Sequence, residues 1–95
     1  MDCGSVSFSR HAIERMFQRS VSPDEILQCI RSGEVIANYP DDSPYPSTLL
    51  LSFTRAEPLH VLVARHDETQ SCFVVTVYRP DPELWGNDFK TRRKS

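Results

Sequence analysis

The sequence predicts an α+β fold: two N-terminal helices packed on a four-stranded antiparallel sheet, in the order ααββββ, with a short C-terminal cap. Two patterns predict this fold. Apolar residues recur at helical spacing up to Gly33 and alternate with other residues after it, which marks the change from helices to strands. Four alternating segments then follow one another across short turn-like sequences, as in an antiparallel meander.

The two helices are predicted from their caps and their apolar faces. Ser9 is the expected N-cap of the first helix. The second helix begins at residues 22–25, which combine a capping box with proline at the first helical position, and it ends at Gly33. The apolar side chains on the two helices are Ala12, Ile13, Met16, Phe17, Ile26, Leu27 and Ile30.

Four strands are expected at residues 34–39, 47–55, 58–66 and 72–80. Three prolines and two aspartates forbid a continuous ladder between the first two strands, so residues 39–47 are read as a loop. The tail at residues 81–89 is expected to cover one sheet face through Leu84, Trp85 and Phe89.

Side chains alternate across a strand, and this fixes the expected register. Phe73, Val75 and Val77 should lie against the helices, and His60, Thr76 and Tyr78 on the opposite face. Leu62, Ala64 and Val74 should form the apolar floor of that opposite face. The expected core comprises Ile13, Met16, Phe17, Ile26, Leu27, Ile30, Leu49, Leu51, Val61, Val63, Val75 and Val77.

The composition is typical of one folded domain spanning residues 1–95, with residues 1–6 and 90–95 expected to be flexible. No apolar run is long enough to cross a bilayer and the first residues lack a signal layout, so a cytoplasmic protein without a membrane partner is expected. Cys3, Cys29 and Cys72 include no C-x-x-C pair and are read as free thiols.

A net charge of −2 argues against strong, indiscriminate binding of nucleic acid. Basic residues nevertheless gather at the ends of the chain, and the last seven residues carry four of them and no acid. Arg92 and Arg93 in this tail are candidates for contact with RNA, although a solvated tail is the alternative.

His60 and Tyr78, with Arg79 at the strand end, would place a proton-transfer group, a phenol and a guanidinium close together. This set suits RNA cleavage by the neighbouring 2′-hydroxyl, which needs a base, an acid and a positive charge near phosphorus. In the alternative, His60 is packed and hydrogen-bonded beneath the tail while Tyr78 covers the apolar floor.

His11, Arg15 and Arg19 form one stripe along the first helix. His11 and Arg15 would act on a phosphate in one interpretation and form a solvated helix edge in the other. No metal or other cofactor is expected, because His11, His60, His66 and Cys72 lack the ligand spacing of a zinc site.

Residues 9–42, 44–51, 59–64 and 76–85 resemble the bacterial family labelled domain of unknown function 4258. The His-Ala-x-x-Arg-Met element at residues 11–16 is its most recognisable part. That family is similar in layout to RelE-type toxins and barnase-like ribonucleases, in which helices precede an antiparallel sheet.

The resemblance implies a RelE-like, metal-independent ribonuclease or toxin-like domain, with RNA as substrate and a small antitoxin-like protein as partner. The rival hypothesis is a non-catalytic module that receives another protein on its open sheet face or edge strand.

Overall fold

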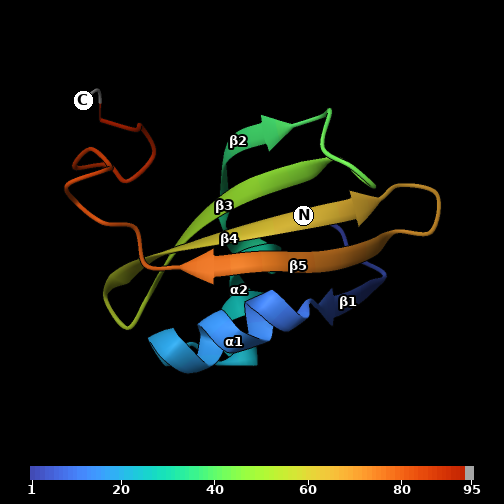
Figure 1. The fold of residues 1–95 in the computed structure, drawn as a ribbon, viewed down its shortest axis with the longest axis horizontal. Coiled ribbons are helices and arrows are strands. Elements are labelled where there is room, and N and C mark those ends of the chain that lie inside the picture. Colours follow the sequence, from blue (N-terminus) through green and yellow to red (C-terminus); the bar gives the residue numbers. More distant parts are fainter. Residues whose placement is uncertain (94–95) are drawn as a thin grey trace.

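A computed structural model describes residues 1–93 and shows a twisted five-stranded sheet accompanied by two helices (Figure 1). The strands lie in the order β1-β5-β4-β3-β2. The elements are β1 (Ser5–Phe8), α1 (Arg10–Arg19), α2 (Pro23–Ser32), β2 (Glu34–Tyr39), β3 (Ser47–Thr54), β4 (Glu57–His66) and β5 (Ser71–Tyr78). Within residues 1–93, neither helix has the length and apolar character needed to cross a lipid bilayer.

The predicted order ααββββ is wrong, because a strand precedes the helices and pairs in parallel with β5. The sheet is therefore mixed rather than antiparallel. β1 has four residues, of which only Val6 and Phe8 pack on the core, so its alternating pattern is short. Its partner strand lies more than sixty positions later in the sequence, where no turn signal links the two. Residues 5 and 6, expected to be flexible, belong to this strand.

Both helices begin where their caps predict. The Ser9 hydroxyl accepts a hydrogen bond from the Ala12 amide at 3.0 Å, and Ser22 and Glu25 form the reciprocal capping box. A residue in the left-handed region, Ser20 with φ 54°, ends α1 and turns the chain into α2. The expected connection at residues 20–22 is confirmed.

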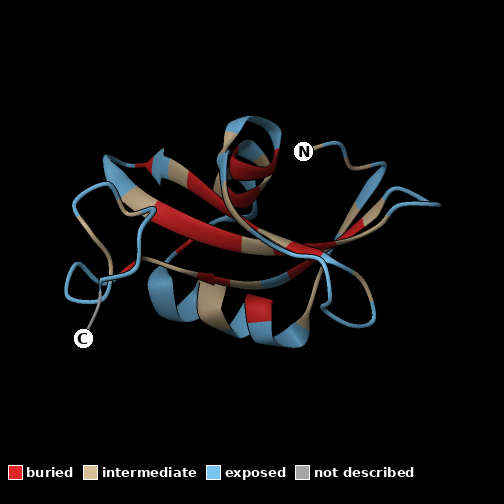
Figure 2. Ribbon diagram, turned by 90° about the horizontal axis from the view of Figure 1, so that it is seen from above, coloured by how far each residue is buried: buried red, intermediate tan, exposed pale blue. Residues whose placement is uncertain are grey.

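The helices cover the sheet unequally. α2 packs across β3 and β4, whereas α1 runs along β5 near the sheet edge (Figures 1 and 2). A helix beside an edge buries only a narrow strip, and in α1 that strip is Ala12 and Met16. Ile13 and Phe17, which we expected in the core, are therefore 44% and 84% exposed.

A β-bulge at Val75 divides the register of β5 into two parts. Val77 pairs with Val61 and faces α2, as predicted, but the ladder shifts between Leu62 and Val63. Val74 therefore joins the core instead of the opposite floor, and Val75 is 37% exposed. The prediction that Val75 and Phe73 lie against the helices is wrong, since the extra residue reverses the alternation.

We call the sheet face opposite α2 the outer face. His60, Leu62, Thr76 and Tyr78 lie on it, as the pairing of His60 with Tyr78 and of Leu62 with Thr76 requires. Phe73 lies there too and stacks on Tyr45 with ring centroids 5.6 Å apart. Leu49 and Leu51 are buried as predicted but line this face, while Leu50 between them enters the core under α2.

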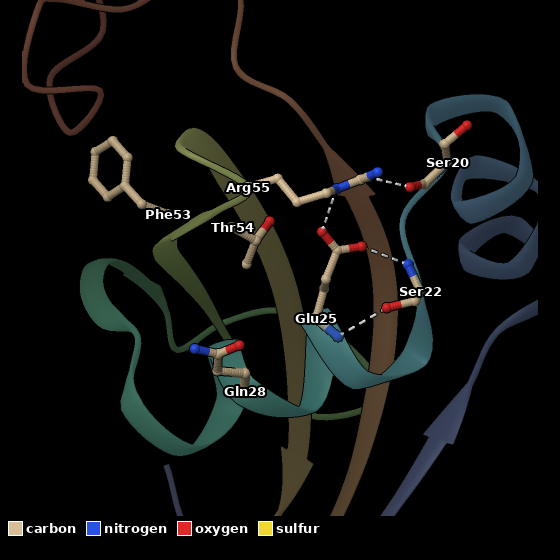
Figure 3. Close-up of a pocket in the computed structure, with 7 residues that line it drawn as sticks. All are labelled: Ser20, Ser22, Glu25, Gln28, Phe53, Thr54 and Arg55. Carbon is tan, nitrogen blue, oxygen red and sulfur yellow. Dashed lines mark hydrogen bonds and ion pairs between the residues drawn. The ribbon is translucent and has the colours of Figure 1, made fainter.

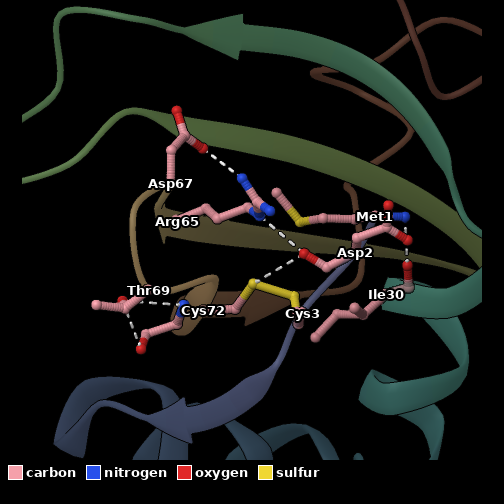
Figure 4. The surroundings of a disulfide bond; sticks show 9 residues. Met1, Asp2, Cys3, Ile30, Arg65, Asp67, Thr69 and Cys72 are labelled. Carbon is pink, nitrogen blue, oxygen red and sulfur yellow. Dashed lines mark hydrogen bonds and ion pairs between the residues drawn. A yellow bond between two sulfur atoms is a disulfide. The ribbon is translucent and has the colours of Figure 1, made fainter.

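Cys3 and Cys72 form a disulfide beside β1, so the prediction of three free thiols is wrong for this pair (Figure 4). The N-terminal residues are held by further contacts: the Met1 ammonium donates to the Ile30 carbonyl at 3.0 Å, and Arg65 Nε donates to the Asp2 carbonyl at 2.7 Å. Sixty-nine positions separate the two cysteines, and no motif in the sequence links them. Cys29 is a free thiol, buried under the sheet.

Candidate functional site

Tyr78 stands at the end of β5, where the outer face meets the C-terminal segment, and it lines two hollows. One hollow, about 300 Å³, lies on the outer face between Tyr39, Asp42, Leu49, Leu62, Thr76 and Tyr78. The other, about 430 Å³, we call the arginine groove. It is lined by Arg19, Tyr78, Arg79, Pro80, Asp81, Leu84, Trp85 and Arg92.

His60 lies opposite Tyr78 on the neighbouring strand β4 and is fully buried. Its Nδ1 is 3.1 Å from the Tyr78 hydroxyl and its Nε2 is 2.7 Å from the Phe89 carbonyl. Burial lowers the pKa of His60 despite the opposing effect of the Phe89 carbonyl, so the ring is neutral at pH 7. Because a carbonyl can only accept, Nε2 carries the proton and Nδ1 accepts from Tyr78.

The structure brings His60 and Tyr78, two of the predicted site residues, together, but it shields His60 from solvent. Trp85 packs edge-on against His60, with ring centroids 4.5 Å apart. His60 is thus hydrogen-bonded beneath the tail, as the alternative interpretation held, and it can act on a substrate only through Tyr78. Burial and the nearby Tyr39 raise the pKa of Tyr78, partly offset by Arg92, so its phenol keeps the proton at neutral pH.

His11 reaches the same sheet face from α1. Its Nε2 is 3.1 Å from the Thr76 hydroxyl, and the Ser9 hydroxyl anchors the start of α1 by donating to the Val75 carbonyl at 2.9 Å. Thr76 and Tyr78 are two residues apart on one strand face, which corresponds to roughly 6.6 Å along the strand. His11 is exposed and lines neither hollow, so its imidazole meets this face at Thr76, two positions along β5 from Tyr78.

The three basic residues of the α1 stripe separate in the structure. Arg15 donates to Gln18 at 2.9 Å within its own helix and lines neither hollow. Arg19, one turn further on, lines the arginine groove. Arg92 lies with its guanidinium carbon 5.8 Å from the Trp85 ring centroid. Within residues 1–93, neither Arg19 nor Arg92 has a carboxylate oxygen within 4.0 Å.

Arg79, predicted to bind substrate, mainly holds the fold together. It pairs with Glu25 at 3.3 Å and donates to the Thr54 hydroxyl at 2.9 Å, and it also contacts the carbonyls of Glu57 and Pro58 at 3.2 Å. Arg79 also lines the arginine groove.

The basic tail is folded up to the last described residue. Arg93 donates to the carbonyls of Pro82 and Trp85 at 2.9 and 2.8 Å, and Lys90 pairs with Glu34 at 2.9 Å. These contacts tie the described part of the tail to the rest of the chain. The prediction of flexibility for residues 94–95 lies outside the described residues.

A third hollow lies between the α1–α2 turn and the β3–β4 turn (Figure 3). Its centre is Glu25, which accepts from the Ser22 amide at 2.7 Å and from Arg55 at 3.1 Å. Burial acts to raise the pKa of Glu25, but these hydrogen bonds, one from Thr54 and the charge of Arg55 outweigh it and lower the pKa. The polar groups already satisfy one another, so this hollow is a structural junction.

The residues considered for zinc are not gathered. His66 stacks on Tyr45 with centroids 4.5 Å apart, and Cys72 is in the disulfide. In the part of the chain that the structure describes, no three His, Cys, Asp or Glu side chains lie together as ligands would.

The fold and the groove define a small α+β domain whose arginine- and aromatic-lined surface forms at the end of a mixed sheet. The family described as Domain of unknown function (DUF4258) matches residues 8–79, and the chain belongs to this family. That match includes His11, His60 and Tyr78, whereas Trp85 and Arg92 follow it. No curated protein and no solved structure matches the chain.

Proposed function

We propose that this protein is a metal-independent ribonuclease that binds RNA across the Tyr78 end of the outer face. The observation that carries the proposal is the arginine groove: Arg19 and Arg92 lack carboxylate partners among the described residues and stand beside Tyr78 and Trp85. Guanidinium groups without carboxylate partners among the described residues, next to half-buried aromatic rings, suit a phosphodiester chain with accessible bases.

His11 and Tyr78 are the proposed catalytic residues. The His11 imidazole takes the proton of the ribose 2′-hydroxyl, whose oxygen attacks the adjacent phosphorus. The phosphorus–O5′ bond breaks, and the Tyr78 hydroxyl rotates away from His60 to give its proton to the departing oxygen. The products are a 2′,3′-cyclic phosphate and a 5′-hydroxyl, and water returns the proton from His11 to the phenolate.

The other proposed roles follow from the same contacts. Arg19 and Arg92 stabilise the charge that develops on the phosphate oxygens. His60 is a positioning residue, because its Nδ1 holds the phenol of Tyr78 in place and its ring never meets solvent. Arg15 keeps its own helix partner and has no catalytic role in this scheme.

Purified protein incubated with a mixed-sequence single-stranded RNA and a metal chelator tests the proposal. Cleavage should persist with the chelator and yield cyclic phosphate ends. Tyr78→Phe and His11→Asn should each slow it by on the order of 10²-fold. Arg10→Gln is the matched control, because Arg10 lies on the same helix as His11, is 95% exposed in its side chain and lines neither hollow. A wild type that does not cleave RNA, or variants that match it, would refute the proposal.

We propose the cytoplasm as the place of action, with a small antitoxin-like protein as the partner of a bacterial toxin-like enzyme. Thiols stay reduced in the cytoplasm, so Cys3 and Cys72 would be a dithiol there, and the protein would have the lower stability expected for its reduced form.

The second candidate function is non-catalytic protein binding through α1. Phe17 at 84% exposure and Ile13 at 44% form an apolar strip one turn apart on the side of α1 turned away from the core. Self-association through this strip would appear as a concentration-dependent dimer in light scattering, and Phe17→Ser would abolish it. That result, from a protein without RNA cleavage, favours the binding module over the ribonuclease.

A further inference from the structure

We propose that the arginine groove takes one unpaired nucleotide of the RNA strand, with its base on the Trp85–Arg92 pair and its phosphate on Arg19. The inference rests on the proposed function and names the form of RNA that the site accepts. It assigns a recognition role to Trp85 and Arg92, which follow the residues matched by the family.

Trp85, the aromatic wall of the arginine groove, is held rigidly before any ligand binds. The Trp85 amide donates to the Asp81 carbonyl at 3.0 Å, its carbonyl accepts from Arg93 at 2.8 Å, and its ring packs on His60. A fixed ring loses little conformational entropy when a base stacks on it. The Arg92 guanidinium lies over the ring, with its carbon 5.8 Å from the centroid, so the pair presents a flat, positively charged surface to a base.

The charges of the groove limit what can enter. Arg19 and Arg92 attract phosphate, whereas Asp81 on the same wall repels it. The Asp81 carboxylate is engaged by the Glu83 amide at 2.8 Å and stays in place. A volume of about 430 Å³ with two available arginines and one acid suits a single nucleotide better than several phosphates in a row.

A base can reach this wall only when it is not paired. In an A-form duplex the bases are stacked inside, and side chains read the outside through phosphates and 2′-hydroxyls. Stacking on an aromatic side chain therefore selects loops, ends and single strands. The groove should bind unpaired RNA and discriminate against duplex RNA.

Trp85 is the one tryptophan of the sequence, so its fluorescence reports occupancy of the groove directly. The probes are an end-labelled 2′-O-methyl oligoribonucleotide, which lacks the attacking hydroxyl, the same strand annealed to its complement, and an abasic strand of equal length. Anisotropy of the label measures binding to any site. The unpaired strand should quench Trp85 and bind about tenfold more tightly than the abasic strand, the factor expected from one stacked base.

Arg92→Gln should reduce both quenching and affinity for the unpaired strand, whereas Arg10→Gln should leave them unchanged. Binding without quenching, equal affinity for the abasic strand, or equal quenching by the duplex would overturn the inference while leaving RNA binding intact. Failure of every probe and of unmodified RNA to bind would overturn the proposed function as well.

Discussion

Reduction of the Cys3–Cys72 disulfide is expected to destabilise the protein strongly. The bond closes a loop across a sequence separation of 69 residues. In the chain-entropy description, a cross-link of that span lowers the conformational entropy of the unfolded chain and so raises its free energy by about 4 kcal/mol. Without it, β1 is held by a four-residue parallel pairing and the contacts of Met1 and Asp2. For a domain of this size, the loss corresponds to a fall in Tm of about 15 °C or more.

Thermal unfolding followed by circular dichroism, with and without a phosphine reductant, measures the effect. Cys3→Ser should melt at the temperature of the reduced wild type and should not respond to the reductant. This comparison separates the cross-link from any other action of the reagent. Equal melting temperatures for the oxidised and reduced wild type would show that the disulfide contributes nothing and that the β1–β5 pairing alone holds the N-terminus.

Three further outcomes are expected. Ser22→Ala should lower the free energy of unfolding by about 1 kcal/mol, because the capping box loses its hydroxyl acceptor, and urea denaturation measures this. Burial lowers the pKa of His60 in the folded protein below its unfolded value of about 6.5. The stability that the neutral His60 contributes is therefore complete above pH ~6.5 and is lost as the pH falls through the folded pKa. Urea midpoints between pH 7.5 and pH 5 should decline in the wild type and less steeply in His60→Gln. Arg79→Gln should lower the free energy of unfolding by about 2 kcal/mol, because it removes charged hydrogen bonds to Thr54 and Glu25. An unchanged urea midpoint would mean that these bonds contribute nothing to stability.

The sequence was informative wherever structure is decided locally. The hydroxyls of Ser9 and Ser22 each accept a hydrogen bond from the amide three residues later, so both helix starts could be predicted from a few adjacent residues. Alternation predicted the four later strands and the outer-face position of His60 and Tyr78. The same rule fails at Val75, because a bulge inserts one residue and no feature of the alternating pattern marks its place.

The long-range pairings could not be predicted from the sequence, and the reason is physical. β1 has too few residues to show a pattern, and its parallel partner is joined to it through both helices and three strands. The disulfide depends on that pairing, which brings Cys3 alongside β5, so it could not be predicted separately. The exposure of Phe17 has a similar origin: helical periodicity defines an apolar face, but only the tertiary fold sets α1 beside an edge instead of over a sheet.

The candidate site shows the same division between residue type and placement. Sequence reasoning named His60, Tyr78, His11 and the basic residues, but it could not show which guanidinium groups are already engaged. Arg79 and Arg93 hold carbonyls and the Glu25 carboxylate, whereas Arg19 and Arg92 remain available in the described chain. One signal was present in the sequence: a single tryptophan and a basic cluster within nine positions of each other.

The buried His60 explains why the groove and the outer face belong to one site. An apolar side chain of similar size would fill the space but would leave the Phe89 carbonyl and the Tyr78 hydroxyl without this partner. The neutral imidazole satisfies both at once, because one nitrogen donates to the C-terminal segment and the other accepts from β5. Protonation of His60 would turn Nδ1 into a donor and break the present arrangement of the Tyr78 proton. His60 therefore joins Trp85, Tyr78 and the C-terminal segment in one contact, and together with the Arg93 and Lys90 contacts of the tail it makes the groove a built part of the fold.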